Sequence, residues 1–466
     1  MSLLSSVTRT LRSSSPFWVA LQQFATRGIV ALKFLVVGRI LGPSAIGEVV
    51  VALLALSLVE ALTQLGIEPS VVQARDELSP AQRNAAWSMQ LIRGALIGAA
   101  LAIFSGFIGN AFGSPASSKL VAVAALIPLF RNGVSIGYID AQRNRRFRPV
   151  GALNMAGAVV DVATSALLIA FGAGVIGVLL GTVIAEGTRF MLSHVVFPAR
   201  VTLVWRPAEI PNLLGYGRWI WAGGLLAAAL DQIDKAVIGV WLGVEQLGYY
   251  QMAGRLAQLA VAEFGMIVGR YLFPTIALQH RTDPRQVAAI VSLGLNLVLQ
   301  VSALVVLTME TVGKSLLLKF LGPEWFAMFP YLRVLLLASV GNGVHSVFAS
   351  FLRAVGRPQA VVYATAIQIV NAVVLYALLG PWLRGIGVAA ATAVSMGVAI
   401  GALAVQARVG RLSANTLVVV ALCASVGVLS AARPGMEWTL FVIGGTGAVC
   451  IAFRSWRAAI GQFRQP

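Results

Sequence analysis

The stretch Leu41-Gly42-Pro43-Ser44-Ala45-Ile46-Gly47 decides the fold, because it ends one apolar run of membrane-spanning length and opens the next. It is echoed by Leu242-Gly243-Val244-Glu245-Gln246-Leu247-Gly248, which keeps the glycine spacing 201 positions later and again separates two apolar runs. A second motif, Asn132-Gly133-Val134 followed by Arg143, recurs as Asn342-Gly343-Val344 followed by Arg353, a shift of 210. These echoes predict two similar halves in one chain.

The composition indicates a membrane protein. Of the 466 residues, 58% are hydrophobic and 11% are charged, and the mean hydropathy is +0.85, a balance that soluble domains do not carry. Apolar windows of about twenty residues, the length that spans a bilayer, can be placed fourteen times between residues 17 and 453. We therefore expect an all-α polytopic membrane protein with about 14 transmembrane helices. Two pseudo-symmetric six-helix lobes around a central cavity should occupy residues 1–205 and 206–412, and residues 413–466 should form two extra helices and a cytoplasmic tail.

The basic residues give an orientation to these windows. With a cytoplasmic N-terminus, 20 Arg and Lys residues fall on the cytoplasmic side and 6 on the opposite side, while 9 lie within the spans. Cytoplasmic loops carry the excess of positive charge in membrane proteins, so both termini should be cytoplasmic and the number of spans even. The first apolar run lacks a cleavage site and is interpreted as a retained helix rather than a signal peptide.

Other classes of protein find little support in the sequence. A net charge of +18 could indicate a nucleic-acid partner, but the basic residues do not gather on a soluble face, so no nucleic acid is expected. No His-Glu-x-x-His motif and no complete phosphate-binding Gly-x-x-x-x-Gly-Lys-Ser/Thr loop is present. Cys423 and Cys450 show no metal or disulfide spacing. We expect no enzyme activity, catalytic residue, cofactor or metal site.

Positive charges inside the predicted spans are the main functional signal. Each costs about 2.5 to 3.5 kcal/mol at the centre of a spanning helix, so each must pair with an acid, reach a surface or line water. The nine are Arg27, Lys33, Arg93, Arg131, Arg189, Lys235, Arg255, Arg270 and Arg333. Arg93, Arg131, Arg189 and Arg333 are interpreted as bracing helices or reaching a surface. For Arg27, Lys33, Arg255 and Arg270 too few acids lie nearby in sequence, which favours a hydrated cavity.

Acidic residues accompany these cations in the helices that open each half. Asp231, Asp234 and Lys235 occupy positions i, i+3 and i+4 and therefore share one face of the seventh helix. That face could line the cavity or form an internal ion pair that joins two helices. Glu60 in the second helix and Glu263 in the eighth add further carboxylates.

An ordered set of motifs resembles the polysaccharide biosynthesis, or O-antigen (Wzx-like) flippase, branch of the multidrug/oligosaccharidyl-lipid/polysaccharide exporter superfamily. The motifs are Gly38-Arg39-Ile40-Leu41-Gly42-Pro43, Ala141-Gln142-Arg143-Asn144-Arg145-Arg146-Phe147-Arg148, Asp234-Lys235-Ala236-Val237-Ile238-Gly239, Leu247-Gly248-Tyr249-Tyr250, and Arg255 with Leu272-Phe273-Pro274. The resemblance implies a transporter of the cytoplasmic (inner) membrane that flips polyprenyl-diphosphate-linked oligosaccharide, a surface polysaccharide precursor, by alternating access.

A diphosphate group needs fixed positive charge in a wet cavity to cross a low-dielectric region. The candidate substrate-binding residues are Arg27, Lys33, Lys235, Arg255 and Arg270, and the candidate cavity or ion-coupling acids are Asp231, Asp234, Glu263 and Glu60. The expected partners are the lipid-linked oligosaccharide, membrane lipids and, for a complete pathway, a glycan polymerase or export machinery. H⁺ and Na⁺ stay open as coupling ions.

Three alternatives stay open. A drug/cation antiporter of the same superfamily would favour a more acidic cavity than this one. A lipid II flippase would have the same number of helices. A membrane-embedded polysaccharide polymerase or ligase belongs to another class, and it normally needs a larger extracytoplasmic loop than any predicted here.

Overall fold

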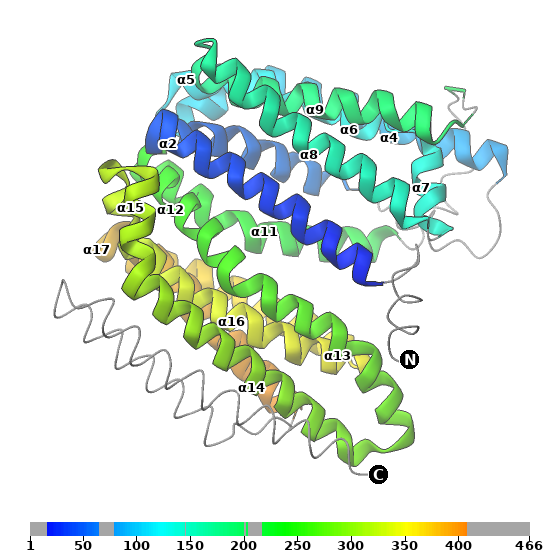
Figure 1. The fold of residues 1–466 in the computed structure, drawn as a ribbon, viewed down its shortest axis with the longest axis vertical. Coiled ribbons are helices and arrows are strands. Elements are labelled where there is room, and N and C mark those ends of the chain that lie inside the picture. Colours follow the sequence, from blue (N-terminus) through cyan, green and yellow to red (C-terminus); the bar gives the residue numbers. More distant parts are fainter. Residues whose placement is uncertain (1–15, 65–78, 145, 200–201, 204–216, 408–466) are drawn as a thin grey trace, which may run out of the picture. The chain divides into compact units, whose positions relative to one another are not determined.

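The computed structural model describes residues 16–64, 79–144, 146–199, 202–203 and 217–407, and within these ranges every regular element is a helix. The chain divides into two compact units, Met1–Gly248 and Tyr249–Pro466. Figure 1 labels the helices along the chain. The polytopic all-α architecture predicted from the sequence is confirmed.

The first unit begins with α2 (Pro16–Leu62), which is two helices joined by a break at Gly42. Gly42 has φ 79°, a value that glycine adopts without steric cost, and Pro43 directly after it cannot continue the hydrogen-bond ladder. The break lies where the Leu-Gly-Pro motif predicts the end of the first span. It turns the chain, so that α2 supplies two of the predicted spans.

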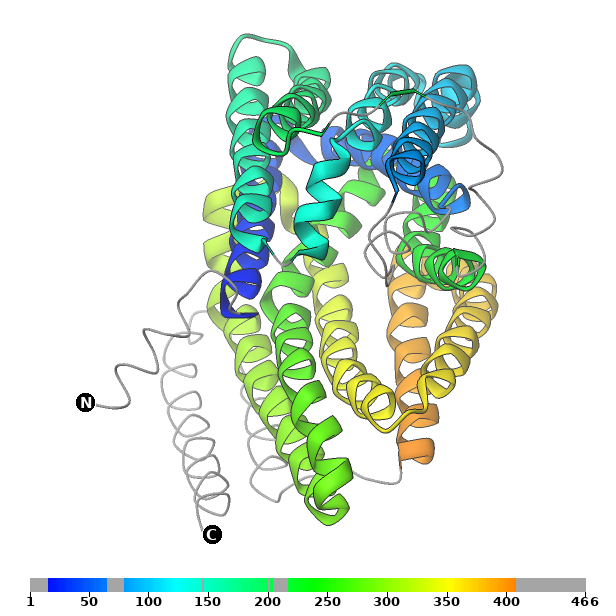
Figure 2. The same ribbon diagram turned by 90° about the vertical axis from the view of Figure 1, so that its right-hand side faces the viewer.

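The helices α4 (Pro80–Ala111), α8 (Phe147–Ala170) and α9 (Gly174–Val196) follow, and α8 packs against both α9 and α2. The first half of α2, dark blue, lies beside α8 in Figure 2. The last helix that lies wholly in this unit is α11 (Gly217–Leu242), which carries the three charges of the predicted polar face.

The fourth span is not the single helix expected from its apolar window. It consists of α5 (Pro115–Ala124), α6 (Ile127–Asn132) and α7 (Ile136–Arg143), with a bend of 58° before α7. Ser135 caps α7, donates its hydroxyl to the Phe197 carbonyl (2.7 Å) and donates its main-chain N–H to Ser193 Oγ (3.0 Å). Buried main-chain groups need partners at such a break, and the C-terminal end of α9 supplies them here.

The second unit begins within α12 (Val244–Ala257), which continues through a π-helical turn (Gln258–Ala262) into α13 (Glu263–Thr282). A second long helical segment consists of α14 (Pro284–Thr308), a π-helical turn (Met309–Gly313) and α15 (Lys314–Leu321). Residues 309–321 are therefore helical. A 3₁₀ turn (Pro323–Met328) leads into α16 (Phe329–Ala354), and α17 (Pro358–Ala407) completes the unit.

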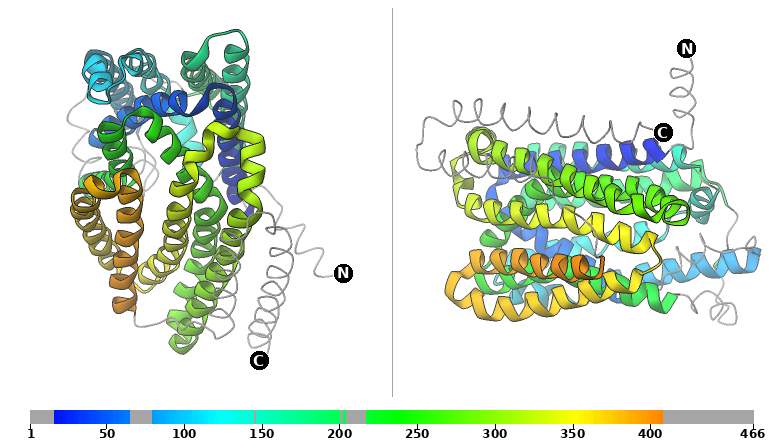
Figure 3. Two further views of the ribbon diagram at one scale, coloured as in Figure 1. Left: turned by 90° about the vertical axis from the view of Figure 1, so that its left-hand side faces the viewer. Right: turned by 90° about the horizontal axis from the view of Figure 1, so that it is seen from below.

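Helix α17 is also two helices, because Arg384 at its centre has φ 50° and breaks the helical path. The two halves fold back on each other, as the orange ribbon in Figure 3 shows. Tyr376 and Thr392 share a hydrogen bond of 3.0 Å across this hairpin, and Ser395 donates to Asn371 over the same distance.

Two hydrogen bonds recur at the spacing of the repeat predicted from the sequence, and the repeat itself stays a prediction. In the first half of the chain Thr182 donates to the Val178 carbonyl (3.2 Å), and 210 positions later Thr392 donates to the Val388 carbonyl (3.1 Å). The predicted boundaries at 205 and 412 stay a prediction, since the compact units divide after Gly248. Residues 413–466 lie outside the described residues, so the total of 14 spans is also still a prediction.

Candidate binding groove in the first compact unit

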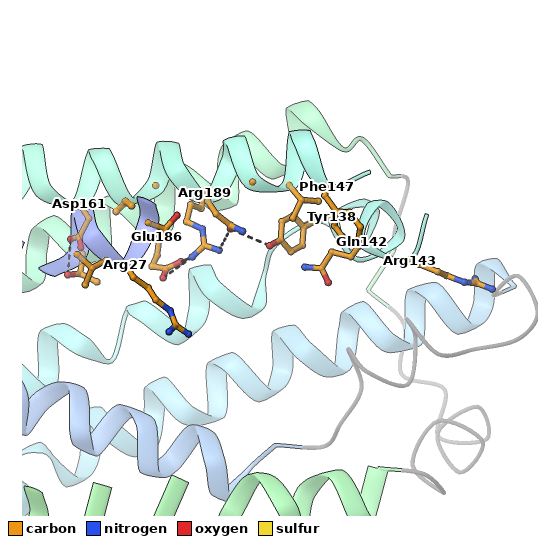
Figure 4. A pocket seen from close by; sticks show the side chains of 17 residues that line it. Arg27, Tyr138, Gln142, Arg143, Phe147, Asp161, Glu186 and Arg189 are labelled. Atoms are coloured by element: carbon orange, nitrogen blue, oxygen red, sulfur yellow. Dashed lines mark hydrogen bonds and ion pairs between the residues drawn. The ribbon is translucent and has the colours of Figure 1, made fainter. Parts of the chain in front are cut away.

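A polar groove of about 900 Å³ lies within the first unit. Four elements form its walls, namely the first half of α2, α7, α8 and α9. Its polar lining residues are Thr26, Arg27, Tyr138, Gln142, Arg143, Asn154, Asp161, Thr182, Glu186 and Arg189. Figure 4 shows Asp161, Glu186, Arg189 and Tyr138 following one another along the groove, while Arg27 projects away from this row.

Helical spacing explains why α8 and α9 bring these side chains to one wall. Asn154 and Asp161 are seven residues apart on α8, and Thr182, Glu186 and Arg189 stand at i, i+4 and i+7 on α9, so each set lies on one face. Gly157 lies between the two α8 residues. A Cβ atom there would be 2.4 Å from Cδ of Arg189, so the glycine makes room for the arginine side chain.

One end of the groove holds a buried ion pair. The Lys33 Nζ atom is 2.6 Å from Asp161 Oδ1, and it also donates to Thr182 Oγ1 (2.9 Å) and to the Val178 carbonyl (3.2 Å). Lys33 is only 5% exposed, and these three oxygen atoms replace the water that its ammonium group loses on burial. The pair joins α2, α8 and α9.

The middle of the groove is organised by Glu186, which is buried and accepts hydrogen bonds from two arginines. Arg131 approaches it to 3.0 Å and Arg189 to 3.1 Å. Arg131 also binds Glu60 at 3.1 Å, so the guanidinium group bridges two carboxylates. Arg93 donates to the main-chain carbonyl of Glu60 (2.7 Å). This network connects α2, α4, α6 and α9.

Both ends of the groove leave polar atoms available. Asn154 Oδ1 accepts hydrogen bonds from Arg189 (2.7 Å) and Tyr138 (3.3 Å). Among the described residues, no partner bonds to the amide nitrogen of Asn154, to the amide of Gln142 or to the second carboxylate oxygen of Asp161. The groove thus presents both hydrogen-bond donors and acceptors.

Comparison with known proteins assigns the chain to a family. Residues 36–330 match the family model described as polysaccharide biosynthesis protein. The chain belongs to the polysaccharide biosynthesis protein family. The match includes α7, α8 and α9, while Arg27 and Lys33 precede it.

Curated relatives in this family carry names from surface polysaccharide synthesis. The chain is 22% identical to the lipopolysaccharide biosynthesis protein WzxC of Escherichia coli strain K12 over 72% of this chain and 69% of the relative. It is 22% identical to the succinoglycan biosynthesis transport protein ExoT of Rhizobium meliloti strain 1021, over 73% and 68%. It is 20% identical to the teichuronic acid biosynthesis protein TuaB of Bacillus subtilis strain 168, over 77% and 74%.

Solved structures share the fold of this family member. The lipid II flippase MurJ in an inward closed conformation superposes with a TM-score of 0.76 at 14% identity, covering 95% of this chain and 100% of that one. An inward-facing multidrug resistance MATE family transporter gives a TM-score of 0.63 at 13% identity, covering 83% and 94%.

The structure places the predicted site residues of this family member in different parts of the molecule. Arg27 lines the groove, Lys33 is held at its end, and Glu60 joins it through Arg131. Lys33 does not present a free ammonium group as a substrate-binding cation would, although its assignment stays a prediction.

On α11, Lys235 lies 3.8 Å from Asp231, one turn away, and Asp234 accepts the Lys235 main-chain N–H at 2.8 Å. This i, i+4 contact lies within α11 and does not itself join two helices. Arg255, Glu263 and Arg270 belong to the second unit, where Glu263 is buried and Arg270 is exposed. Their assignments stay predictions.

Sequence reasoning missed the centre of the groove. The ion pairs of Arg131 and Arg189 support their interpretation as bracing residues, but the sequence leaves Glu186 and Asp161 open between bracing and a cavity role, and it gives no indication of Asn154. The available signal was the seven-residue spacing of Asn154 and Asp161, repeated by Thr182 and Arg189. Across the described ranges, no cluster of His, Cys, Asp or Glu could hold a metal ion.

Proposed function

We propose that this chain is a flippase that moves a polyprenyl-diphosphate-linked oligosaccharide, a precursor of a surface polysaccharide, across the cytoplasmic membrane. Its relatives WzxC, ExoT and TuaB are named for lipopolysaccharide, succinoglycan and teichuronic acid biosynthesis, and ExoT is named as a transport protein. The structural neighbour MurJ is named as a lipid II flippase. The proposal applies these names to a chain of the same family.

The observation that carries the proposal is an excess of positive charge around a groove inside an apolar helical unit. Six cations, Arg27, Lys33, Arg93, Arg131, Arg143 and Arg189, line the groove or join its network, against three carboxylates, Glu60, Asp161 and Glu186. A diphosphate is strongly hydrated, and fixed guanidinium groups can replace part of its hydration as it leaves water.

The residues of the first unit take different parts in this proposal. Arg27 binds the diphosphate, because it is a cation that lines the groove. Lys235 supplies a second cation. Lys33 neutralises Asp161 and positions the groove wall. Asp231, Asp234 and Glu60 set the local field, and a coupling ion, H⁺ or Na⁺, would exchange at one of the acids.

The proposal extends to location and partners. The chain lies in the inner membrane with both termini in the cytoplasm, as the distribution of basic residues favours. It acts beside a glycan polymerase or export machinery and is not itself an enzyme. A drug/cation antiporter fits the groove less well, since cationic substrates would be repelled by the excess of arginine.

The test is leaflet exchange in liposomes. Purified full-length protein is reconstituted with lipid-linked oligosaccharide that is extracted from the cells in which this protein is native. The glycan of the extracted lipid carries a fluorophore. The proposal expects exchange faster than in protein-free liposomes, with or without an imposed H⁺ or Na⁺ gradient. Exchange equal to the protein-free rate under every gradient would contradict it.

A further inference from the structure

We propose that the part of the groove formed by α7, α8 and α9 is a saccharide subsite, in which Asn154, Gln142 and Asp161 bind the hydroxyl groups of the glycan carried by the lipid, while Arg27 on α2 binds the diphosphate. This inference rests on the proposed function and adds to it. It assigns a part of the substrate to particular side chains, and it separates recognition of the glycan from recognition of the diphosphate.

The groove has dimensions that suit a short oligosaccharide. Its volume of about 900 Å³ lies in the range of small-molecule sites, about 300 to 1,000 Å³. Its lining residues on α8 extend from Phe147 to Asp161, a length of about 21 Å at the helical rise of 1.5 Å per residue. The site is therefore elongated and follows one helix.

The chemistry of the lining distinguishes a sugar from a phosphate. A phosphate group offers only acceptors, whereas each sugar hydroxyl both donates and accepts. The uncommitted atoms of the groove include the Asn154 amide nitrogen as a donor, the second Asp161 oxygen as an acceptor and the Gln142 amide as both. A carboxylate oxygen in the wall would repel a phosphate and would accept a hydroxyl.

Ion pairing strengthens this argument. Asp161 is neutralised by Lys33, and Glu186 is shared by Arg131 and Arg189, so this wall is polar without a large excess of charge. The side chain of Asn154 is also held in place, because Arg189 and Tyr138 both donate hydrogen bonds to its Oδ1 atom. A pre-ordered set of polar groups lowers the entropy cost of binding a flexible glycan. An acyl chain would cover these half-buried polar groups and leave them without partners.

Two aromatic side chains border the uncommitted amides. Phe147 and Tyr138 lie at the end of the groove beside Gln142 (Figure 4). Flat apolar rings next to hydrogen-bonding amides match the surface of a sugar, which has apolar C–H faces and polar edges. This end therefore receives one sugar ring, and Asp161 contacts a unit farther along the glycan.

The experiment compares two lipids that differ only in the glycan. Full-length protein in detergent is mixed with equal amounts of undecaprenyl diphosphate and the extracted lipid-linked oligosaccharide, and native mass spectrometry measures the ratio of the two bound species. The variants are Gln142→Ala and Asn154→Ala. Gln359→Ala is the matched control, because Gln359 is an exposed amide at the start of α17 with no hydrogen-bond partner among the described residues.

We expect the wild type and Gln359→Ala to prefer the glycosylated lipid. Gln142→Ala and Asn154→Ala should each reduce that preference about five- to tenfold, the effect of losing one or two hydrogen bonds, while binding of undecaprenyl diphosphate stays unchanged. An unchanged preference in both variants would overturn the saccharide assignment. If the variants lost binding of both lipids equally, the saccharide assignment would be overturned in favour of a diphosphate site. If the wild type exchanged no lipid-linked oligosaccharide between leaflets, the proposed function itself would fail.

Discussion

Gly47 and Gly248 pack against each other's turns through the main chain alone. A Cβ atom at Gly47 would be 1.7 Å from the Val244 carbonyl oxygen, and one at Gly248 would be 2.0 Å from the Pro43 carbonyl oxygen. Pro43 and Val244 occupy equivalent places in the two echoed motifs. The contact is therefore reciprocal, as across a two-fold axis, and it explains why both motifs keep their second glycine.

Gly47→Ala and Gly248→Ala should each destabilise the protein by about 1–3 kcal/mol, since the added methyl group would collide with rigid backbone. Thermal unfolding in detergent measures this as a lower melting temperature. Gly106→Ala is the control, because nothing lies within 4 Å of its added Cβ. That variant should be neutral or slightly more stable through helix propensity. Equal melting temperatures for all three variants would contradict the close approach.

Glu186→Gln should destabilise the first unit by about 1–3 kcal/mol, because it leaves Arg131 and Arg189 with one carboxylate fewer between them. The matched control is Glu310→Gln, which removes a carboxylate from a more exposed pair with Arg333 (2.9 Å). Pairs of that kind contribute less than about 1 kcal/mol. Chemical unfolding of the two variants should therefore separate them, and the same loss in both would mean that Glu186 does not organise the network.

Lys33 and Asp161 should behave as a unit. Lys33→Met alone leaves the Asp161 carboxylate without its cation. It should lower the free energy of unfolding by about 2–4 kcal/mol, similar to the loss when one partner of a buried ion pair is removed. The double variant Lys33→Met with Asp161→Asn should recover part of this loss, and a double-mutant cycle should give a coupling of at least about 1 kcal/mol. Additive losses would show that the two side chains act independently.

More of the fold than of the groove could be predicted from the sequence. Apolar length identified the spans, and Gly42-Pro43 marked the first break, because local residues decide both. The break before α7 could not be predicted from its apolar window, since the groups that satisfy it come from Ser193 and Phe197. Lys33 looked unpaired for a related reason. Its partner Asp161 lies 128 positions away, and only packing of α2 against α8 brings them together.

The central claim is that a cationic groove carries a diphosphate lipid across the membrane, and Arg27 tests it most directly. Leaflet exchange of the tagged lipid-linked oligosaccharide should fall about tenfold or more in Arg27→Ala, which loses a charge-assisted hydrogen bond, and Arg27→Lys should restore part of the rate. Lys119→Ala removes an exposed cation outside the groove and should exchange lipid like the wild type. Full exchange by Arg27→Ala, at the wild-type rate in the same liposomes, would contradict the account.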